Sequence, residues 1–280
     1  MKAVRRPPLG NLCRRGVPIE SRRRFAKLAF AILVLLTAGS FLPGDPLTPS
    51  ISNVPQAAQP TMPFRVGEIL NYRLEWAAFS NAASVQTVVA ERRNLFGWQT
   101  WHFRASLHSQ APLRTLFEVD DQFDSYTDAA TLESRQYEMY LNEMGKKQDE
   151  VLHLIAVGQS PRGNVAPVMV QPGTRDPLGA FYVLRETDWK RTPEVRVPLY
   201  DGSDLYEMRA HLEVSMETVA ITNGNFQAAK IAIHLFMHGK EVPETNFSVW
   251  LARDAARTPV LILAEMPYGN VRAELTAMPK

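Results

Sequence analysis

The sequence is poor in cysteine: a single one, Cys13, occurs in 280 residues. Cys13 lies within the basic first 27 residues, so a chain cleaved behind that region contains no cysteine. This excludes disulfides, thiolate metal sites and cysteine nucleophiles from such a mature protein. Catalytic signatures are lacking too, because no G-x-S-x-G, G-x-x-x-x-G-K-[ST] or G-x-G-x-x-G stretch occurs. With 45% hydrophobic and 21% charged residues, the composition excludes disorder, collagen and a polytopic membrane protein.

Acidic residues are almost absent from the first 27 positions, which contain one acid, Glu20, and nine lysines and arginines. The remaining chain holds 22 basic and 28 acidic residues, so the formal net charge of +2 hides an acidic body. An acidic body lacks the surplus of positive charge that a surface binding the phosphates of nucleic acids requires. We therefore expect no nucleic-acid partner.

The first 42 residues predict an export signal. The basic stretch 21–27 precedes an uncharged run of 15 residues, 28–42, and small residues near its end, at 38–40, suit cleavage by a signal peptidase. As a helix, this run would reach only about 22 Å, which is short for a bilayer core of about 30 Å. Ser21-Arg22-Arg23-x-Phe25-x-Lys27 resembles the twin-arginine signal, and a Sec signal stays open as an alternative. An uncleaved signal-anchor is a further alternative, in which residues 25–42 contact the membrane.

Residues 43–63 contain six prolines and almost no charge, which predicts an extended linker. From residue 64 onward the chain alternates between apolar and polar residues, as in an antiparallel sheet with one wet face. In the segment 101–107, for example, Trp101 and Phe103 fall opposite His102. The other alternating segments are 71–76, 117–123, 135–141, 194–198, 229–237, 247–251 and 260–266.

Short turns such as Asn223-Gly224 separate these segments, so sequence neighbours should be sheet neighbours. A meander of about ten twisted strands must curl. We therefore predict one mainly all-β domain over 64–280, a long curved antiparallel meander forming an open or partly closed barrel. One short helix is expected at 177–185, with Asp176 as its cap and Pro177 at its first position.

The apolar sides of the early strands carry candidate ligand-binding residues. Tyr72, Trp76, Trp101 and Phe103 would fill the core or line a cavity for an acyl chain or a sugar. Tyr182 and Arg185 of the predicted helix complete the set. Arg185 would reach an anionic head group or, alternatively, pair with Asp176.

Three other groups are candidates for metal or acid–base chemistry. His234 and His238 have metal-ligand spacing on a helix, but a strand spreads them about 13 Å apart. Asp120, Asp121 and Asp124 offer oxygen ligands for calcium, although they lack the glycine and closing glutamate of a calcium loop and fit a solvated strand edge better. Glu118 and Glu133 would serve glycoside hydrolysis only at a suitable separation. We expect no metal, no cofactor and no identified catalytic residue.

Five stretches of the body carry a recognisable pattern: Gly67-Glu68-x-Leu70-x-Tyr72, Asp176-Pro177-Leu178-x-Ala180-Phe181-Tyr182-x-Leu184-Arg185, Asn223-Gly224-x-Phe226-x-Ala228, Val249-Trp250-Leu251-x-x-Asp254-x-x-Arg257-x-Pro259-Val260 and Tyr268-Gly269-x-Val271-x-Ala273-Glu274-Leu275. Together they resemble DUF3108, a family of uncharacterised bacterial exported proteins. The resemblance covers most of residues 64–277 and implies an exported β-rich domain, but it supplies no catalytic residue. The stretch from Trp250 to Val260 also resembles the last strands of LolA/LolB-type lipoprotein carriers, whose curved sheet holds acyl chains on its concave face.

These observations favour an exported protein of the periplasm or cell envelope that binds a hydrophobic or amphipathic ligand without turnover. The ligand would be a lipid or an envelope glycan intermediate, held on the concave face of the sheet. Two other classes stay open. One is an envelope polysaccharide-active enzyme that uses a carboxylate pair. The other is a structural or assembly protein with envelope protein partners, whose apolar face is filled by its own side chains.

Overall fold

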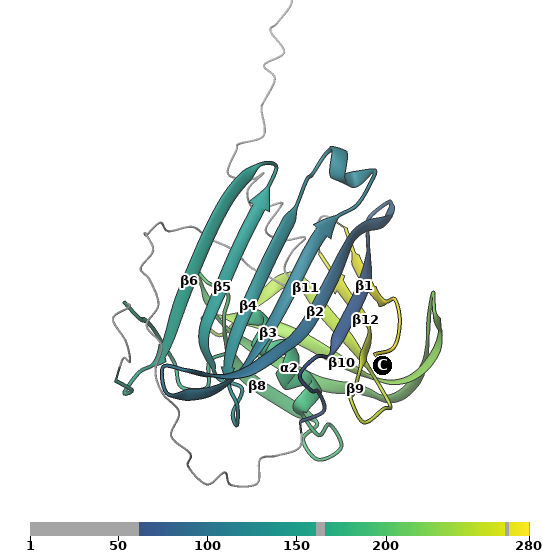
Figure 1. The fold of residues 1–280 in the computed structure, drawn as a ribbon. Helices are drawn as coiled ribbons and strands as arrows, with labels where there is room; N and C mark the ends of the chain where they lie inside the picture. The colour runs from purple at the N-terminus through teal and green to yellow at the C-terminus, as the bar shows by residue number, and fades with distance from the viewer. Residues whose placement is uncertain (1–61, 161–165, 267–268, 280) are drawn as a thin grey trace, which may run out of the picture.

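The computed structural model describes residues 62–160, 166–266 and 269–279. Its thirteen strands form one sheet in the order β7-β6-β5-β4-β3-β2-β1-β13-β12-β11-β10-β9-β8 (Figure 1). All neighbours run antiparallel except β6 and β7, and the last strand pairs with the first. The strands are β1 (Ile69–Trp76), β2 (Phe79–Leu95), β3 (Trp98–Ser109), β4 (Asp120–Asp128), β5 (Ser134–Glu143), β6 (Lys146–Ala156), β7 (Val168–Val170), β8 (Glu194–Tyr200), β9 (Leu205–Ile221), β10 (Gly224–Met237), β11 (Lys240–Ala252), β12 (Pro259–Glu265) and β13 (Val271–Leu275).

The two ends of this sheet are bridged by the segment just before the helix. Thr174 O accepts from the Ser134 amide of β5 at 3.1 Å, and the Arg175 amide donates to Pro198 O of β8 at 2.9 Å. The Tyr200 amide returns a bond to Arg175 O at 2.8 Å. The sheet therefore curls into a nearly closed barrel, and the prediction of a curved, mainly all-β meander with a partly closed barrel is confirmed.

The predicted helix is confirmed as α2 (Pro177–Glu186). Asp176 caps it, because its Oδ1 accepts from the Gly179 amide at 2.8 Å, and Pro177 occupies the first turn, where no amide donor is needed. Asp176 Oδ2 also accepts from the hydroxyls of Ser125 at 2.6 Å and Ser134 at 2.5 Å. The carboxylate thus ties the helix to β4 and β5.

We expect Asp176→Ala to lower the free energy of unfolding by about 1–2 kcal/mol, because the helix loses its cap and two buried hydroxyls lose an acceptor. Burial raises the pKa of Asp176, so part of the loss is offset by removing a poorly solvated carboxyl. Urea unfolding measures the change. Asp188, just beyond α2 and with a half-exposed side chain, is the matched control, and equal effects at both positions would contradict the cap's role.

The inside of the barrel is filled by α2 and by the inward side chains of the strands. The Tyr182 ring stacks on Phe103 of β3 with centroids 3.6 Å apart, and Phe64 meets Tyr182 edge-on at 4.9 Å. Phe64, predicted as the first residue of the domain, is buried in this core. The concave face is therefore packed by the chain's own residues.

The tip of the β2–β3 hairpin folds over the outer face of β4–β6 and gives the barrel wall a second layer there (Figure 1). The Phe96 ring lies 5.2 Å from His153 of β6. The Arg135 guanidinium of β5 lies 4.0 Å from the Trp98 ring centroid. This layer explains why outward-facing polar residues of β3–β5, such as Asp124, are buried.

One part of the sequence-based prediction lies outside the described residues, and one predicted strand starts later than expected. The predicted signal (1–42) and residues 43–61 of the predicted linker lie outside the described residues. The strand expected at 117–123 begins only at Asp120, because residues 113–115 form a short 3-10 helix (η1, Leu113–Thr115) whose turn also holds Phe117. Phe117, expected on an apolar strand face, is exposed. Among the described residues, no helix combines the length and apolarity needed to cross a membrane.

Candidate functional site

Most of the aromatic residues predicted to line a ligand cavity lie in the core. Tyr72, Trp101 and Phe103 face the inside of the barrel, Tyr182 projects from α2, and all four are buried. Trp76 lies apart, half-buried at the far end of β1. The structure thus brings four of the five aromatic residues together against α2, and their role in ligand binding stays a prediction.

Arg185 does not pair with Asp176, which caps the opposite end of the same helix. Its guanidinium forms a two-pronged ion pair with Glu68, at 2.5 Å to Oε1 and 3.0 Å to Oε2, and donates to Ala256 O at 3.0 Å. Nine residues along a helix separate Asp176 from Arg185 by about 13 Å, which rules out contact. Since Arg185 is completely buried, it offers no exposed donor to an anionic head group in this structure.

An open groove lies instead on the outer face of β1–β3, with a volume of about 530 Å³. Apart from the core residues Tyr72 and Val85, its strand side chains come from the polar half of the strand alternation, opposite the core. Across the three strands they form two rows, one through Asn71, Gln86 and Ser106 and one through Arg73, Ser84 and His108. The complete lining is Asn71, Tyr72, Arg73, Asn81, Ser84, Val85, Gln86, Ser106, His108, Gln110 and Thr276.

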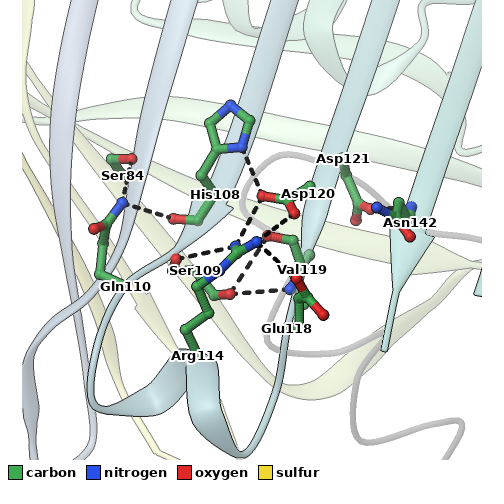
Figure 2. Close-up of polar contacts among 10 residues, drawn as sticks. All are labelled: Ser84, His108, Ser109, Gln110, Arg114, Glu118, Val119, Asp120, Asp121 and Asn142. Carbon is green, nitrogen blue, oxygen red and sulfur yellow. Dashed lines mark hydrogen bonds and ion pairs between the residues drawn. The ribbon is translucent and has the colours of Figure 1, made fainter. Parts of the chain in front are cut away.

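Amides and hydroxyls dominate the groove, and they are already oriented by one another. Gln86 Nε2 donates to Asn71 Oδ1 at 2.9 Å. Figure 2 shows the second such bond, in which Gln110 Nε2 donates to Ser84 Oγ at 3.0 Å. Each amide has further donor and acceptor positions beyond these bonds. The groove therefore presents donors and acceptors side by side, with the Arg73 guanidinium paired to Glu274 at 3.0 Å at its edge.

An ion cluster stands beside the groove at the end of the barrel, as Figure 2 shows. Arg114 lies between Asp120, at 2.7 and 2.9 Å, and Glu118, at 2.8 Å. His108 Nδ1 is 2.9 Å from the same Asp120 carboxylate. The hydrogen bond from Arg114 lowers the pKa of Asp120 to about 2, so this carboxylate is ionised throughout the physiological range. The cluster links the groove residue His108 to the loop that follows β3.

The predicted calcium ligands do not converge. Asp120 faces outward in the ion cluster, whereas Asp121 faces the barrel interior, as strand pleating predicts. Asp124 faces outward again and is held by Arg104 at 2.8 Å and by His102 at 2.5 Å. Among the described residues, no group of three or more histidines, cysteines, aspartates or glutamates is placed to hold a metal ion.

The other two candidate pairs are also separated. His234 lies on β10, bound to Glu241 at 2.7 Å, and His238 lies in the following turn, so the helical metal spacing does not arise. Glu118 precedes β4 and Glu133 follows it. The nine residues of β4 span about 30 Å, far beyond the separation that glycoside hydrolysis requires.

Sequence reasoning missed the groove because it searched the apolar halves of the strands. The alternation did place Arg73 and Ser106 on wet faces. It held no sign that the polar faces of three neighbouring strands would form a concave surface, because concavity depends on how the sheet coils. A run of small or amide side chains at facing positions is the only local signal for this groove.

Comparisons with known proteins concern family and fold. The family model described as "Protein of unknown function (DUF3108)" matches residues 71–276, which confirms the resemblance. No curated protein is significantly similar in sequence. A beta-barrel-like protein of the domain of unknown function DUF1849 from Brucella abortus is 13% identical, with TM-score 0.47, 76% of this chain covered and 97% of that chain.

Two further solved structures have lower TM-scores. A candidate lipoprotein from Parabacteroides distasonis is 12% identical, with TM-score 0.36 and coverage of 76% of this chain and 95% of that chain. A candidate exported protein with a YmcC-like fold from Bacteroides fragilis is 11% identical, with TM-score 0.36 and coverage of 78% and 98%. At such identities the likeness concerns the fold alone.

Proposed function

The chain belongs to the DUF3108 family, whose function is unknown, and from this premise we propose that it is an exported envelope protein that binds a glycan in the outer groove of β1–β3 without turnover. The observation that carries the proposal is the lining of that groove. It is an open hollow of about 530 Å³ in which two adjacent rows of polar side chains, most of the lining being amides and hydroxyls, cross the three strands. The ligand we propose is uncharged in the main and rich in hydroxyl groups.

The chemistry of the lining favours a glycan over a lipid. Sugar hydroxyls both donate and accept, and Asn71, Gln86 and Gln110 do the same through their amides. An acyl chain would gain nothing from these groups, since it would desolvate them without replacing their hydrogen bonds. The concave face expected to hold a lipid is occupied by α2 and the aromatic core, which moves the proposed site to the outside.

The absence of turnover rests on the carboxylates around the groove. Asp120 is held by Arg114 and His108, and Glu274 is held by Arg73 and Arg272. A carboxylate fixed as an ion pair is a poor general acid, because its proton is lost well below neutral pH. Binding without chemistry is what these neighbours support.

We expect Asn71→Ala combined with Gln86→Ala to weaken glycan binding about tenfold to a hundredfold, because two hydrogen-bonding amides leave the groove floor. The probes are uncharged oligosaccharides of N-acetylglucosamine and of glucose, measured by isothermal titration with the full chain. Gln227→Ala is the matched control. Gln227 carries an amide on β10 that donates to Thr218 at 2.7 Å, away from the groove, and its loss should leave affinity unchanged.

Two results would contradict this function. One is that the unaltered chain binds neither class of glycan. The other is that binding occurs with equal strength in the double variant, which would place the glycan elsewhere on the domain. If the double variant also unfolds at a markedly lower temperature, the single variants Asn71→Ser and Gln86→Ser replace it in the binding measurement. Each keeps a hydroxyl in the groove.

A further inference from the structure

β6 leaves most of one edge unpaired at the margin of the sheet (Figure 1). On the side away from β5, the described part of the chain pairs β6 only at 154–156, with β7. Residues 146–153 therefore border no further strand of the described sheet, and we call them the open edge. Lys147, Asp149 and Val151 of this segment are exposed. An unpaired row of backbone amides and carbonyls is a template on which another strand can pair.

The turn before β6 determines which residues present their backbone groups to the open edge. Residues 144–145, both with positive φ, form a two-residue turn that places Glu143 opposite Lys146. Residues that flank such a turn bond to each other, so Lys146 and every second residue after it bond to β5. The odd-numbered residues between them point their amides and carbonyls outward. The Val157 amide has the same direction, since it donates to Val170 O of β7 at 2.9 Å.

The charges of the open edge are ordered by sign, with two lysines before and two acids after a central glutamine in Lys146-Lys147-Gln148-Asp149-Glu150. None of the four charged side chains forms an ion pair with another described residue. Across the hairpin, Lys147, Asp149 and Glu150 face uncharged residues of β5, and only Lys146 faces an acid, Glu143. The strand therefore carries charges that the rest of the described chain does not pair.

We propose that two copies of this chain associate through β6, whose open edges pair antiparallel about a twofold axis at Gln148. A twofold antiparallel pair brings one residue opposite its own copy, and the residues on either side then pair in order. With Gln148 at the axis, Lys147 meets Asp149 of the second copy, and Lys146 meets Glu150 of the second copy. Each of these pairs occurs twice. Opposite charges at facing positions stabilise an antiparallel pair.

The charge order selects both this register and a second copy as the occupant. An axis at either lysine or at either acid would place like charges opposite each other. An axis at any residue of 151–153 would bring the second strand against 154–156, where β7 already lies. Edge lysines alone would serve to keep other strands away. Here two acids follow them at the positions that match the lysines of a reversed copy, and a strand of another protein would need the same order of charges.

Two buried polar atoms of β6 are consistent with the same pairing. Gln148 Nε2 and Glu150 Oε2 have no hydrogen-bond partner within the described residues. In the proposed pair, Gln148 meets an amide that both donates and accepts, and Glu150 meets an ammonium group. Both side chains therefore gain the kind of partner that they lack within the single chain.

The pairing is short, because residues 146–150 of each copy form it. Its area falls below the roughly 1,200 Å² of a standard stable interface, so we expect a dissociation constant of about 10–100 μM. The proposal is independent of the glycan groove, which lies on β1–β3.

Sedimentation velocity of the full chain, over a concentration series that spans this range, tests the dimer. Lys147→Asp places two acids opposite each other and should raise the dissociation constant about tenfold or more, and Asp149→Lys should do the same with two lysines. An equimolar mixture of these two single variants should restore the dimer, because each supplies the charge that the other lacks. Lys240→Asp, at an exposed position of β11, is the matched control and should leave the dissociation constant unchanged.

A cysteine at the axis tests the register. In the full chain carrying Cys13→Ser, Gln148→Cys brings two thiols to facing positions, where Cβ atoms lie about 4.5–5.5 Å apart and a disulfide needs little adjustment. Mild oxidation with diamide should link this variant into a covalent dimer. Val151→Cys is equally near the edge, but its two copies would lie about 20 Å apart and should not be linked.

Four results would overturn the proposal. They are a chain that stays monomeric over the whole series, a dimer that persists in both single charge variants, a mixture of these variants that stays monomeric, and equal linking at positions 148 and 151. Association through the apolar residues 28–42 would produce the second result, because it does not depend on Lys147 or Asp149. Linking of position 148 to a different protein in a cell extract, with the purified chain monomeric, would place another partner at this edge and would also overturn it.

Discussion

Replacing Arg185 with alanine is expected to lower the free energy of unfolding by about 3–5 kcal/mol, the largest single effect we expect in this domain. Arg185 is completely buried and forms two hydrogen bonds with Glu68, at 2.5 and 3.0 Å. Its removal leaves the Glu68 carboxylate in the core without a compensating charge. The pair also joins the end of α2 to the start of β1, so its loss loosens the helix inside the barrel.

Urea unfolding of the full chain, followed by tryptophan fluorescence, measures this effect. Arg185→Met combined with Glu68→Leu removes both charges and should recover much of the lost stability, because no unpaired charge stays buried. The exposed pair Arg196 and Glu194 is the matched control. Its nitrogen and oxygen are 2.6 Å apart, yet Arg196→Ala should cost less than about 1 kcal/mol.

A loss in Arg185→Ala no larger than that in Arg196→Ala would contradict the buried pair. So would a double variant less stable than Arg185→Ala, since both charges would then be net stabilising in the core. The first result would mean that α2 is held in the barrel by aromatic packing alone, chiefly through Tyr182 and Phe103.

The pair also illustrates where sequence reasoning stops. The helix itself was predictable from local chemistry, because Asp176 and Pro177 are start signals that act within one turn. The partner of Arg185 was not, because Glu68 lies 117 residues away and meets it only after the sheet has curled. The nearby acid in the sequence, Asp176, was the natural guess and was wrong.

The alternation of apolar and polar residues predicted which face of the sheet a side chain occupies, but it did not predict how the sheet curves. It correctly placed Asp120 and Asp121 on opposite faces of β4, and it placed the groove residues Arg73 and Ser106 on wet faces. It failed at Phe117, which fits the strand period although the backbone is still in the turn that follows η1 and β4 begins only at Asp120. The groove is not encoded in any one segment, because it arises where three separate strands meet.

Replacing Asp121 with asparagine is expected to stabilise the domain by about 2–4 kcal/mol at about pH 8. Asp121 is 1% exposed on the inner face of β4. Burial, with smaller contributions from Glu143 and Asp120, raises its pKa to about 7, while the Asn142 amide that donates to Oδ1 at 2.8 Å opposes the rise. Asparagine keeps the acceptor for that amide and cannot ionise.

The sign of the pH dependence follows from the raised pKa. Because the folded chain binds the Asp121 proton more tightly than the unfolded chain, this group's contribution to stability is fully present below about pH 4 and is lost as the pH rises through about 7. The difference in stability between Asp121→Asn and the unaltered chain should therefore be small near pH 4 and grow up to about pH 7. Urea unfolding at a series of pH values measures it.

Asp120→Asn gives the opposite case one residue away and separates burial from any general effect of losing a carboxylate. Arg114 lowers the pKa of Asp120 to about 2, so this group stabilises the fold above its unfolded pKa and its contribution is lost only as the pH falls through about 2. Asp120→Asn should then destabilise the chain at neutral pH, whereas Asp121→Asn stabilises it. If Asp121→Asn were destabilising at every pH, the carboxylate would be ionised in the folded state and held by the Asn142 amide, and the interior at this end of the barrel would have to be wetter than the packing of β4 against β5 indicates.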